Sequence, residues 1–423
     1  MKLKLLKSSL LAALIMASGL TAQATDQALL DLLVKNGYVT QAQAAALAKE
    51  ADSVDFSVKS KKVDKVQLTG RLHIQYDNIS VDDDTDAASD HPSAVNSFIL
   101  RRIYLGAKVS FYEDWSGTII ARFNDNSSDL DKALITKTHD NGKFDFGYRK
   151  VNFGFEENTS SSKIKAVERS LVSRYFNERA NPRRVGIGGR HIGVYAEGNH
   201  NGLGYGLAIT NGRGEGDDID STPDADDTNE LGFYANAHYT AKMDGMSLKA
   251  GLNLGYQPEG NTPFAEDDGV TEKSDIFAYN PYAELKWGHF RLVGEFLGAS
   301  IDNGAQGSGD DADPWGINIM PSFKINDQWE LVFRYSHLDG DDRGIRVSDG
   351  IRRANNPDGD PAYNEADAFY FGFNWYIKGN DLKLSAGYEY ADFSDRLNGS
   401  GVEDPNGEDA EAHAFRARLQ MLF

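Results

Sequence analysis

From Val66 onward, apolar and polar residues alternate along the chain with a period of two. Between Val66 and Tyr76, the even-numbered positions are mostly apolar and the odd-numbered positions are polar. This alternation predicts strands with one apolar face and one polar face. The pattern recurs to the last residue, and we expect sixteen strands. Their predicted ranges are 66–77, 97–112, 116–124, 131–138, 143–153, 185–197, 202–211, 229–241, 246–256, 276–287, 289–300, 314–325, 328–338, 367–377, 381–391 and 412–423.

The connections between these strands alternate between short and long. Short ones such as His139–Gly142 and Met243–Gly245 carry the residues of hairpin turns. Between them lie seven longer polar loops and one short loop at 125–130. Tight turns at one end and long loops at the other are typical of outer-membrane barrels. The sequence therefore predicts an all-β fold, a 16-stranded antiparallel transmembrane β-barrel with both termini on the periplasmic side.

The N-terminal region has a different pattern. Residues 1–24 resemble a secretory signal, with three Lys, a short apolar run and the cleavage site Ala22-Gln23-Ala24. We predict a short N-terminal helical segment and linker in the periplasm over 25–62, followed by the barrel domain over 63–423. The helical segment could be a plug-side or oligomerisation element, or a mobile tether.

The composition agrees with a membrane barrel. No apolar stretch reaches the length of about 18 residues that a membrane helix needs, and the mean hydropathy is −0.50. A barrel keeps such low hydropathy because lipid-facing and lumen-facing side chains alternate. Trp115, Trp287, Trp329 and Trp375 fall near the short turns, where an interfacial girdle would lie. The last strand ends on outward-facing Phe423, and we expect it to pair with the first strand because an open edge in lipid is costly.

The chain is acidic, with a formal net charge of −20. The loops 78–96, 212–228, 257–275 and 301–313 hold 22 Asp or Glu and two Lys or Arg. Solvation and divalent-cation bridging to lipopolysaccharide explain such loops, and a protein calcium site is the alternative. The run Asp82–Asp86 does not fit an EF-hand loop, which needs Gly at position six and Glu at position twelve. We predict no metal site.

The loop 154–184 differs from the other long loops because it is basic and partly apolar. It has seven basic and four acidic residues. We expect it to fold inward and narrow the pore. The predicted lumen-facing positions of the unambiguous strands also carry twice as many basic as acidic residues. These cations could select anions, because low-dielectric walls focus their electric field on a passing ion. Alternatively, they pair with the acidic residues and hold the lumen open.

Three passages resemble the phosphate-selective porin O and P family. They are Arg101–Gly106, Tyr148–Ser161 continuing to Glu168-Arg169-Ser170, and Arg183–Arg190. The similarity is most specific over 147–195 and extends over 63–423. The resemblance implies a trimer, a third loop folded into the pore, and a ladder of arginines that guides anions to a constriction. With Lys150, Lys163 and Lys165 as candidate constriction lysines, the predicted pore-lining and anion-binding residues are Arg71, Arg101, Arg102, Arg122, Arg149, Lys150, Lys163, Lys165, Arg169, Arg174, Arg183 and Arg184.

Together these patterns predict a porin in the outer membrane of a Gram-negative bacterium. We expect small phosphate-like anions as solutes, contact with lipid and lipopolysaccharide, a homotrimer, no cofactor and no nucleic-acid partner. The acidic outer loops depart from a simple anion funnel, so phosphate preference stays open. A structural or adhesin-type barrel is one alternative. A barrel enzyme is another, since His73, His191 and His238 are predicted to face the lumen, although no G-x-S-x-G or H-E-x-x-H motif occurs.

Overall fold

The computed structural model describes most of the barrel. The described residues are 63, 65–83, 94–123, 128–179, 181–212, 230–261, 274–306, 310–357, 361–398, 401–405 and 407–423. The chain divides into two compact units, Met1–Gln67 and Leu68–Phe423. The predicted signal, helical segment and linker at 1–62 lie outside the described residues, as do large parts of the acidic loops.

The described residues form sixteen strands and three short helices. The strands are β1 Lys65–Asp83, β2 Ala94–Phe111, β3 Trp115–Phe123, β4 Ser128–His139, β5 Gly142–Lys150, β6 Arg190–His200, β7 Leu203–Asn211, β8 Leu231–Met243, β9 Met246–Asn261, β10 Ser274–Trp287, β11 Phe290–Ile301, β12 Trp315–Lys324, β13 Trp329–Asp339, β14 Ala362–Asn380, β15 Leu382–Leu397 and β16 Ala410–Leu422. The helices are α4 Phe155–Asn158, α5 Leu171–Asn177 and α6 Val347–Gly350.

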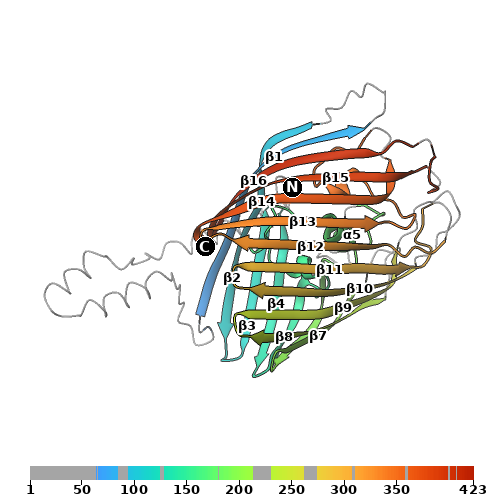
Figure 1. Cartoon of the computed structure of the whole chain (residues 1–423). Helices are drawn as coiled ribbons and strands as arrows, with labels where there is room; N and C mark the ends of the chain where they lie inside the picture. Colours follow the sequence, from blue (N-terminus) through green and yellow to red (C-terminus); the bar gives the residue numbers. More distant parts are fainter. Residues whose placement is uncertain are drawn as a thin grey trace, which may run out of the picture. The chain divides into compact units, whose positions relative to one another are not determined.

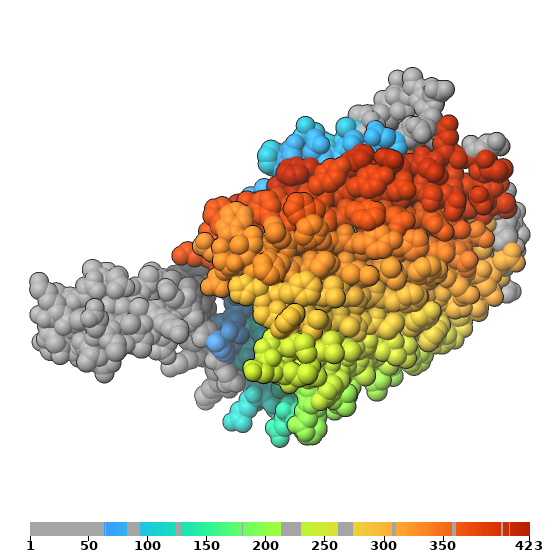
Figure 2. Space-filling model, viewed as in Figure 1, coloured from blue at the N-terminus to red at the C-terminus, as the bar shows by residue number. Residues whose placement is uncertain are grey.

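The strands close into one antiparallel barrel in sequence order (Figure 1). In the face viewed in Figure 2, the strands from β7 to β16 form a continuous wall. The last strand pairs with the first in the register from Arg71↔Leu422 to Asp83↔Ala410. The prediction of a closed 16-stranded barrel is confirmed.

The closing seam explains why the chain ends on an aromatic residue. The Gly70 nitrogen donates to the Phe423 carbonyl at 2.7 Å, and the Phe423 nitrogen donates back at 3.2 Å. A Cβ at Gly70 would lie 2.1–2.7 Å from atoms of the Phe423 ring. Gly70 therefore leaves room for the terminal ring to lie across the first strand, a packing that protects a glycine in a sheet.

The predicted faces of β1 and the predicted place of two tryptophans are also confirmed. In β1, Ile74 is 39% exposed, whereas the neighbouring His73 and Gln75 are buried in the interior. At the short-turn end, Trp329 pairs with Trp375, and their rings stack with centroids 5.5 Å apart. This pair belongs to the predicted aromatic girdle, where the indole ring meets the headgroup level.

The alternation slips by one residue in β2. Before the slip, Phe98 and Leu100 are exposed at even positions, whereas beyond it the even positions Tyr104 and Lys108 line the interior. Arg101 and Arg102 lie at the slip, and both approach the same carboxylate, that of Glu168. A bulge of this kind lets two adjacent side chains face the same side of a sheet. Both arginines of the pair thus reach the lumen.

Two predicted strand ends were wrong at the inner loop. The strand predicted over 143–153 ends at Lys150, and the strand predicted over 185–197 begins at Arg190. Residues from Val151 to Gly189 leave the wall because Phe153, Val185 and Ile187 bury their side chains inside the barrel. By contrast, β1 and β14 are longer than predicted. Strand β1 continues to Asp83 and β14 begins at Ala362, and the added residues pair with a neighbouring strand.

Candidate functional site

The loop Val151–Gly189 lies inside the barrel, as predicted from its apolar residues. Its helix α5 buries Leu171, Val172, Tyr175 and Phe176. Helix α5 contacts β11, β12 and β13, and Figure 1 shows it behind β12 and β13. A Cβ at Gly316 of β12 would lie 2.8 Å from the Val172 side chain, so this glycine lets the helix approach the wall.

Polar contacts fix the rest of the loop to the same half of the barrel. The backbone nitrogen of Phe155 donates to Glu295 of β11 at 3.0 Å, and Lys165 pairs with Glu330 of β13 at 2.8 Å. Burial lowers the pKa of Lys165, and the charge of Glu330 offsets part of this effect. Arg334 bridges the loop and the wall, since it bonds to the Glu168 carbonyl at 2.8 Å and to Glu389 at 2.5 Å.

A second loop, described over residues 340–357, also folds inward, which the sequence did not lead us to expect. Its helix α6 packs against α5, and Arg174 donates to the carbonyls of Ser348 at 2.8 Å and Gly350 at 3.0 Å. Asp349 of α6 is fully buried and accepts from Arg184 at 2.7 Å. The constriction is thus built from two loops that are bonded to each other.

The two loops leave a cavity along the opposite wall. This cavity has a volume of about 1130 Å³ and lies between the inner loop and strands β1 to β6. Thirteen Lys or Arg and five Asp or Glu line it. The basic residues are Arg71, Arg101, Arg102, Lys108, Arg122, Lys132, Lys143, Arg149, Lys150, Arg169, Arg179, Arg190 and Arg352, and the acidic residues are Asp131, Asp145, Glu157, Glu178 and Glu197.

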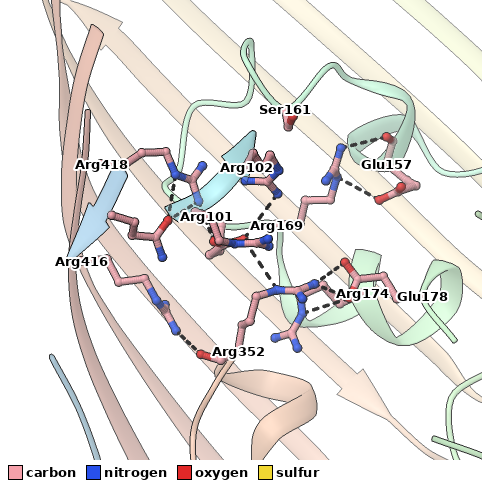
Figure 3. Close-up of polar contacts among 12 residues, drawn as sticks. Arg101, Arg102, Glu157, Ser161, Arg169, Arg174, Glu178, Arg352, Arg416 and Arg418 are labelled. Atoms are coloured by element: carbon pink, nitrogen blue, oxygen red, sulfur yellow. Dashed lines mark hydrogen bonds and ion pairs between the residues drawn. The ribbon is translucent and has the colours of Figure 1, made fainter. Parts of the chain in front are cut away.

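A cluster of guanidinium groups surrounds one carboxylate at the edge of this cavity. Glu168 accepts from Arg101 at 2.7 and 3.0 Å and from Arg418 at 2.5 Å, and Arg352 lies 3.7 Å away. Figure 3 shows these three arginines gathered together. Arg102 approaches it at 3.8 Å. Burial raises the pKa of Glu168, but the charges of the arginines outweigh it and hold the pKa well below its usual range. Arg352 also pairs with Glu178, but Glu168 alone cannot neutralise Arg101, Arg102 and Arg418, so the cluster keeps excess positive charge.

Three cations of the cavity have no carboxylate partner. Among the residues that the structure describes, Arg71, Lys108 and Lys132 form no ion pair. Arg71 instead donates to Ser161 at 2.5 Å and to Ser160 at 3.2 Å, and it lies 5.1 Å from the Tyr104 ring centroid. Because no carboxylate among the described residues pairs with these cations, their electric field acts on a passing solute.

Seven of the twelve predicted site residues line the cavity. They are Arg71, Arg101, Arg102, Arg122, Arg149, Lys150 and Arg169. Several of them are also paired: Arg122 with Asp129 at 2.9 Å, and Arg149 with Asp145 and Glu197 at 2.5 Å each. Lys150 bonds to the Glu157 carboxylate. Arg169 forms an ion pair with Glu157 at 2.9 Å and donates to three backbone carbonyls of the inner loop, so it holds the loop as well as facing the cavity.

The other five predicted residues do not line the cavity. Arg174 and Arg184 are buried between α5 and α6, and Lys165 is bonded to the wall. The carbonyl of Arg183 accepts from Arg343 at 2.8 Å, which again joins the two loops. Lys163 is exposed away from the cavity. These side chains hold or flank the inner loops.

Six basic residues of the cavity are not among the predicted site residues. They are Lys108, Lys132, Lys143, Arg179, Arg190 and Arg352. Lys132 and Arg190 lie in the predicted strands 131–138 and 185–197. The alternation of apolar and polar residues did not show which face of these two strands points into the lumen. Arg352 belongs to the second inner loop, whose several arginines resemble those of the first and were the available signal.

Among the described residues, no three His, Asp or Glu side chains gather around a space that could hold a metal ion. None of the helices in the described ranges is long and apolar enough to cross a membrane.

Comparison with known proteins agrees with this geometry. The model of the family "Phosphate-selective porin O and P" matches residues 66–423. A search of curated proteins finds no match. Among solved structures, an anion-selective porin from Comamonas acidovorans has 13% identity and a TM-score of 0.55, with 84% of this chain and 99% of that chain covered.

Two further structures show the same fold. Pseudomonas putida OprB has 12% identity and a TM-score of 0.54, with 83% of this chain and 94% of that chain covered. The outer membrane channel DcaP of Acinetobacter baumannii has 12% identity and a TM-score of 0.52, with 87% and 99% covered. The chain belongs to the phosphate-selective porin O and P family, and it is an outer-membrane porin that forms a channel.

Proposed function

We propose that this porin selects anions and carries phosphate-like solutes through the cavity between its inner loop and strands β1 to β6. The observation that carries the proposal is the excess of basic residues in the lining, 13 against five acidic ones. The chain as a whole has a net charge of −20, so this local excess has the opposite sign. Narrow walls of low dielectric strengthen such a field.

Arginine is suited to phosphate in particular. Its planar guanidinium offers paired donors that match phosphate oxygens, and ordinary ion pairs leave some of those donors available. Arg71, with the hydroxyls of Ser160 and Ser161 beside it, offers cation and hydroxyl donors at one place in the lining. Chloride is attracted by the positive charge, but it has no set of oxygens to match these donors.

Phosphate added to a chloride solution tests the proposal. Purified protein in a planar lipid bilayer would conduct in KCl, and inorganic phosphate would then be titrated on one side. We expect the chloride current to fall and saturate, because phosphate occupies the basic cavity longer than chloride does. A current that does not respond to phosphate would contradict the phosphate part of the proposal.

We also propose that the porin assembles as a trimer and contacts lipopolysaccharide through its acidic outer loops. Both statements rest on the family resemblance and on the loop composition.

A further inference from the structure

A second, smaller cavity adjoins the basic one. It has a volume of about 300 Å³ and lies beside helix α4, against strands β6 to β10. Asn152, Asn158, Thr159 and Glu197 line both cavities. A solute of more than one functional group can therefore touch both at once. The smaller volume lies at the lower end of the range of small-molecule pockets, roughly 300–1,000 Å³.

The chemistry of the smaller cavity differs from that of the basic one. Its charged lining consists of Glu197 and Lys249. Phe155 and Tyr282 lie together in it, with ring centroids 4.7 Å apart and an angle of 31° between their planes. The Lys249 ammonium lies 5.8 Å from the Phe155 centroid and 5.7 Å from the Tyr282 centroid. Two aromatic rings with an ammonium group beside them bind a ring-shaped solute better than a small inorganic ion.

Three polar groups of this cavity have hydrogen-bonding capacity to spare. Within the described part of the chain, the side chains of Asn236, His238 and Lys249 form no hydrogen bond or ion pair. An amide, an imidazole and an ammonium supply both donors and an acceptor. Inorganic phosphate held in the basic cavity would leave this second set unused. A solute with hydroxyl groups on a ring would engage it.

We propose that the pore has a two-part binding site for anionic sugars such as sugar phosphates. The anionic group binds in the basic cavity, and the hydroxylated ring lies in the smaller cavity against Phe155 and Tyr282. The proposal rests on the proposed anion selectivity and adds the class of organic solute. It predicts that a sugar phosphate is bound more tightly than either of its parts.

Current block in a bilayer tests the two-part site. Chloride current would be titrated with inorganic phosphate, glucose 6-phosphate and glucose. We expect glucose 6-phosphate to reach half-block at a concentration about tenfold lower than phosphate, a difference of roughly 1.4 kcal/mol. We expect glucose to block much more weakly than either. Equal half-block by the two phosphates would overturn the proposal, and so would block by glucose as strong as block by glucose 6-phosphate.

Variants separate a binding role from a structural one. Tyr282→Leu should remove the advantage of glucose 6-phosphate and leave block by phosphate unchanged. Tyr239→Leu is the matched control, because Tyr239 is 55% exposed on the outer face. His238→Ala is a second variant and should reduce the advantage by about threefold. If Tyr282→Leu and His238→Ala left the advantage intact, or weakened both phosphates equally, the second cavity would have no role in binding.

These outcomes are distinguishable from failure of the proposed function. Phosphate that blocks the current normally, with no advantage for the sugar phosphate, defeats the two-part site alone. Phosphate that has no effect defeats the proposed function.

Discussion

At the scale of single residues, ion pairing decides which cations can act on a passing solute. Arg334 and Arg416 are buried against Glu389 at 2.5 and 2.7 Å, so their charge is largely neutralised by the wall itself. Arg71, Lys108 and Lys132 line the cavity without such a partner in the described structure. We assign most of the selectivity to these three and to the excess charge around Glu168.

The first prediction concerns Lys132. Lys132→Glu should lower the permeability ratio of anion to cation by roughly three- to tenfold. Reversing one charge changes the lining by two units, which at about 8 Å in water amounts to ~1 kcal/mol, and 1.4 kcal/mol is a factor of ten. Lys163→Glu makes the same change on an exposed residue outside the cavity and is the control. Bilayer zero-current potentials give both ratios, and an equal effect of the two variants would contradict our assignment.

The sequence predicted cavity residues well where the alternation was regular. Arg71, Arg122 and Arg149 follow from the inward positions of clear strands. Arg174 did not follow, because charge alone does not show that a guanidinium is bonded to the carbonyls of Ser348 and Gly350, nearly 180 residues along the chain. Long-range contacts between two loops leave no periodic signal in a single sequence.

At the scale of elements, the constriction depends on the joint between the two inner loops. Asp349 is fully buried and accepts from Arg184 at 2.7 Å, from Asn181 at 2.9 Å and from the backbone of Arg346 at 3.0 Å. The basic loop was recognisable from its composition, since its apolar residues needed a surface to pack on. The second loop was not recognised, because its sequence lacks a comparable apolar run.

We predict that Asp349→Ala loosens both inner loops and leaves the barrel closed. Removing this carboxylate leaves the buried Arg184 with Glu178 as its remaining carboxylate partner, and an unpaired buried group typically costs about 1–3 kcal/mol. Single-channel records should show larger conductance and more closures than the parent. Far-UV circular dichroism should be unchanged. A variant with parental conductance and noise would show that the joint does not hold the constriction.

Acid should also loosen the contact between the two inner loops, at a pH below the usual pKa of a carboxyl group. Burial raises the pKa of Glu178, but Arg352, Arg174 and Arg184 outweigh it and hold the pKa below its usual range. A carboxyl with a lowered pKa stabilises the folded loop above its unfolded pKa of about 4.3 and loses this effect as pH falls through the folded value. Channel noise should thus stay constant from about pH 7 to 5 and rise only in stronger acid. A rise between pH 7 and 5 would contradict this origin.

At the scale of the whole molecule, the barrel depends on one seam that joins its first and last strands. The seam includes the backbone bonds between Gly70 and Phe423 and the terminal ring that lies over that glycine. An unpaired edge in lipid costs several kcal/mol for each unsatisfied backbone group. Closure was predictable from the cost of an open strand edge in lipid, but the match between Gly70 and the terminal ring required the register.

We predict that deletion of Phe423 lowers the amount of folded barrel in the outer membrane and leaves export intact. Gly70→Val should give a milder form of the same defect, because its side chain would displace the ring. Gly245→Val is a control in a short turn, where no atom lies within 4 Å of an added Cβ, although the strain of its positive φ must be subtracted. Heat-modifiable migration on a gel measures the folded fraction. A normal folded fraction in the deletion variant would contradict a role of the terminal residue.

The central claim is that an acidic protein forms an anion-selective pore, because the lining rather than the outer loops controls permeation. Charges on solvated loops are screened beyond about 8 Å at physiological salt. The direct measurement is the zero-current potential of the purified protein in a neutral lipid bilayer under a KCl gradient. We expect a potential whose sign is set by chloride. A potential with the sign set by potassium would contradict it and would assign control of the pore to the acidic outer loops.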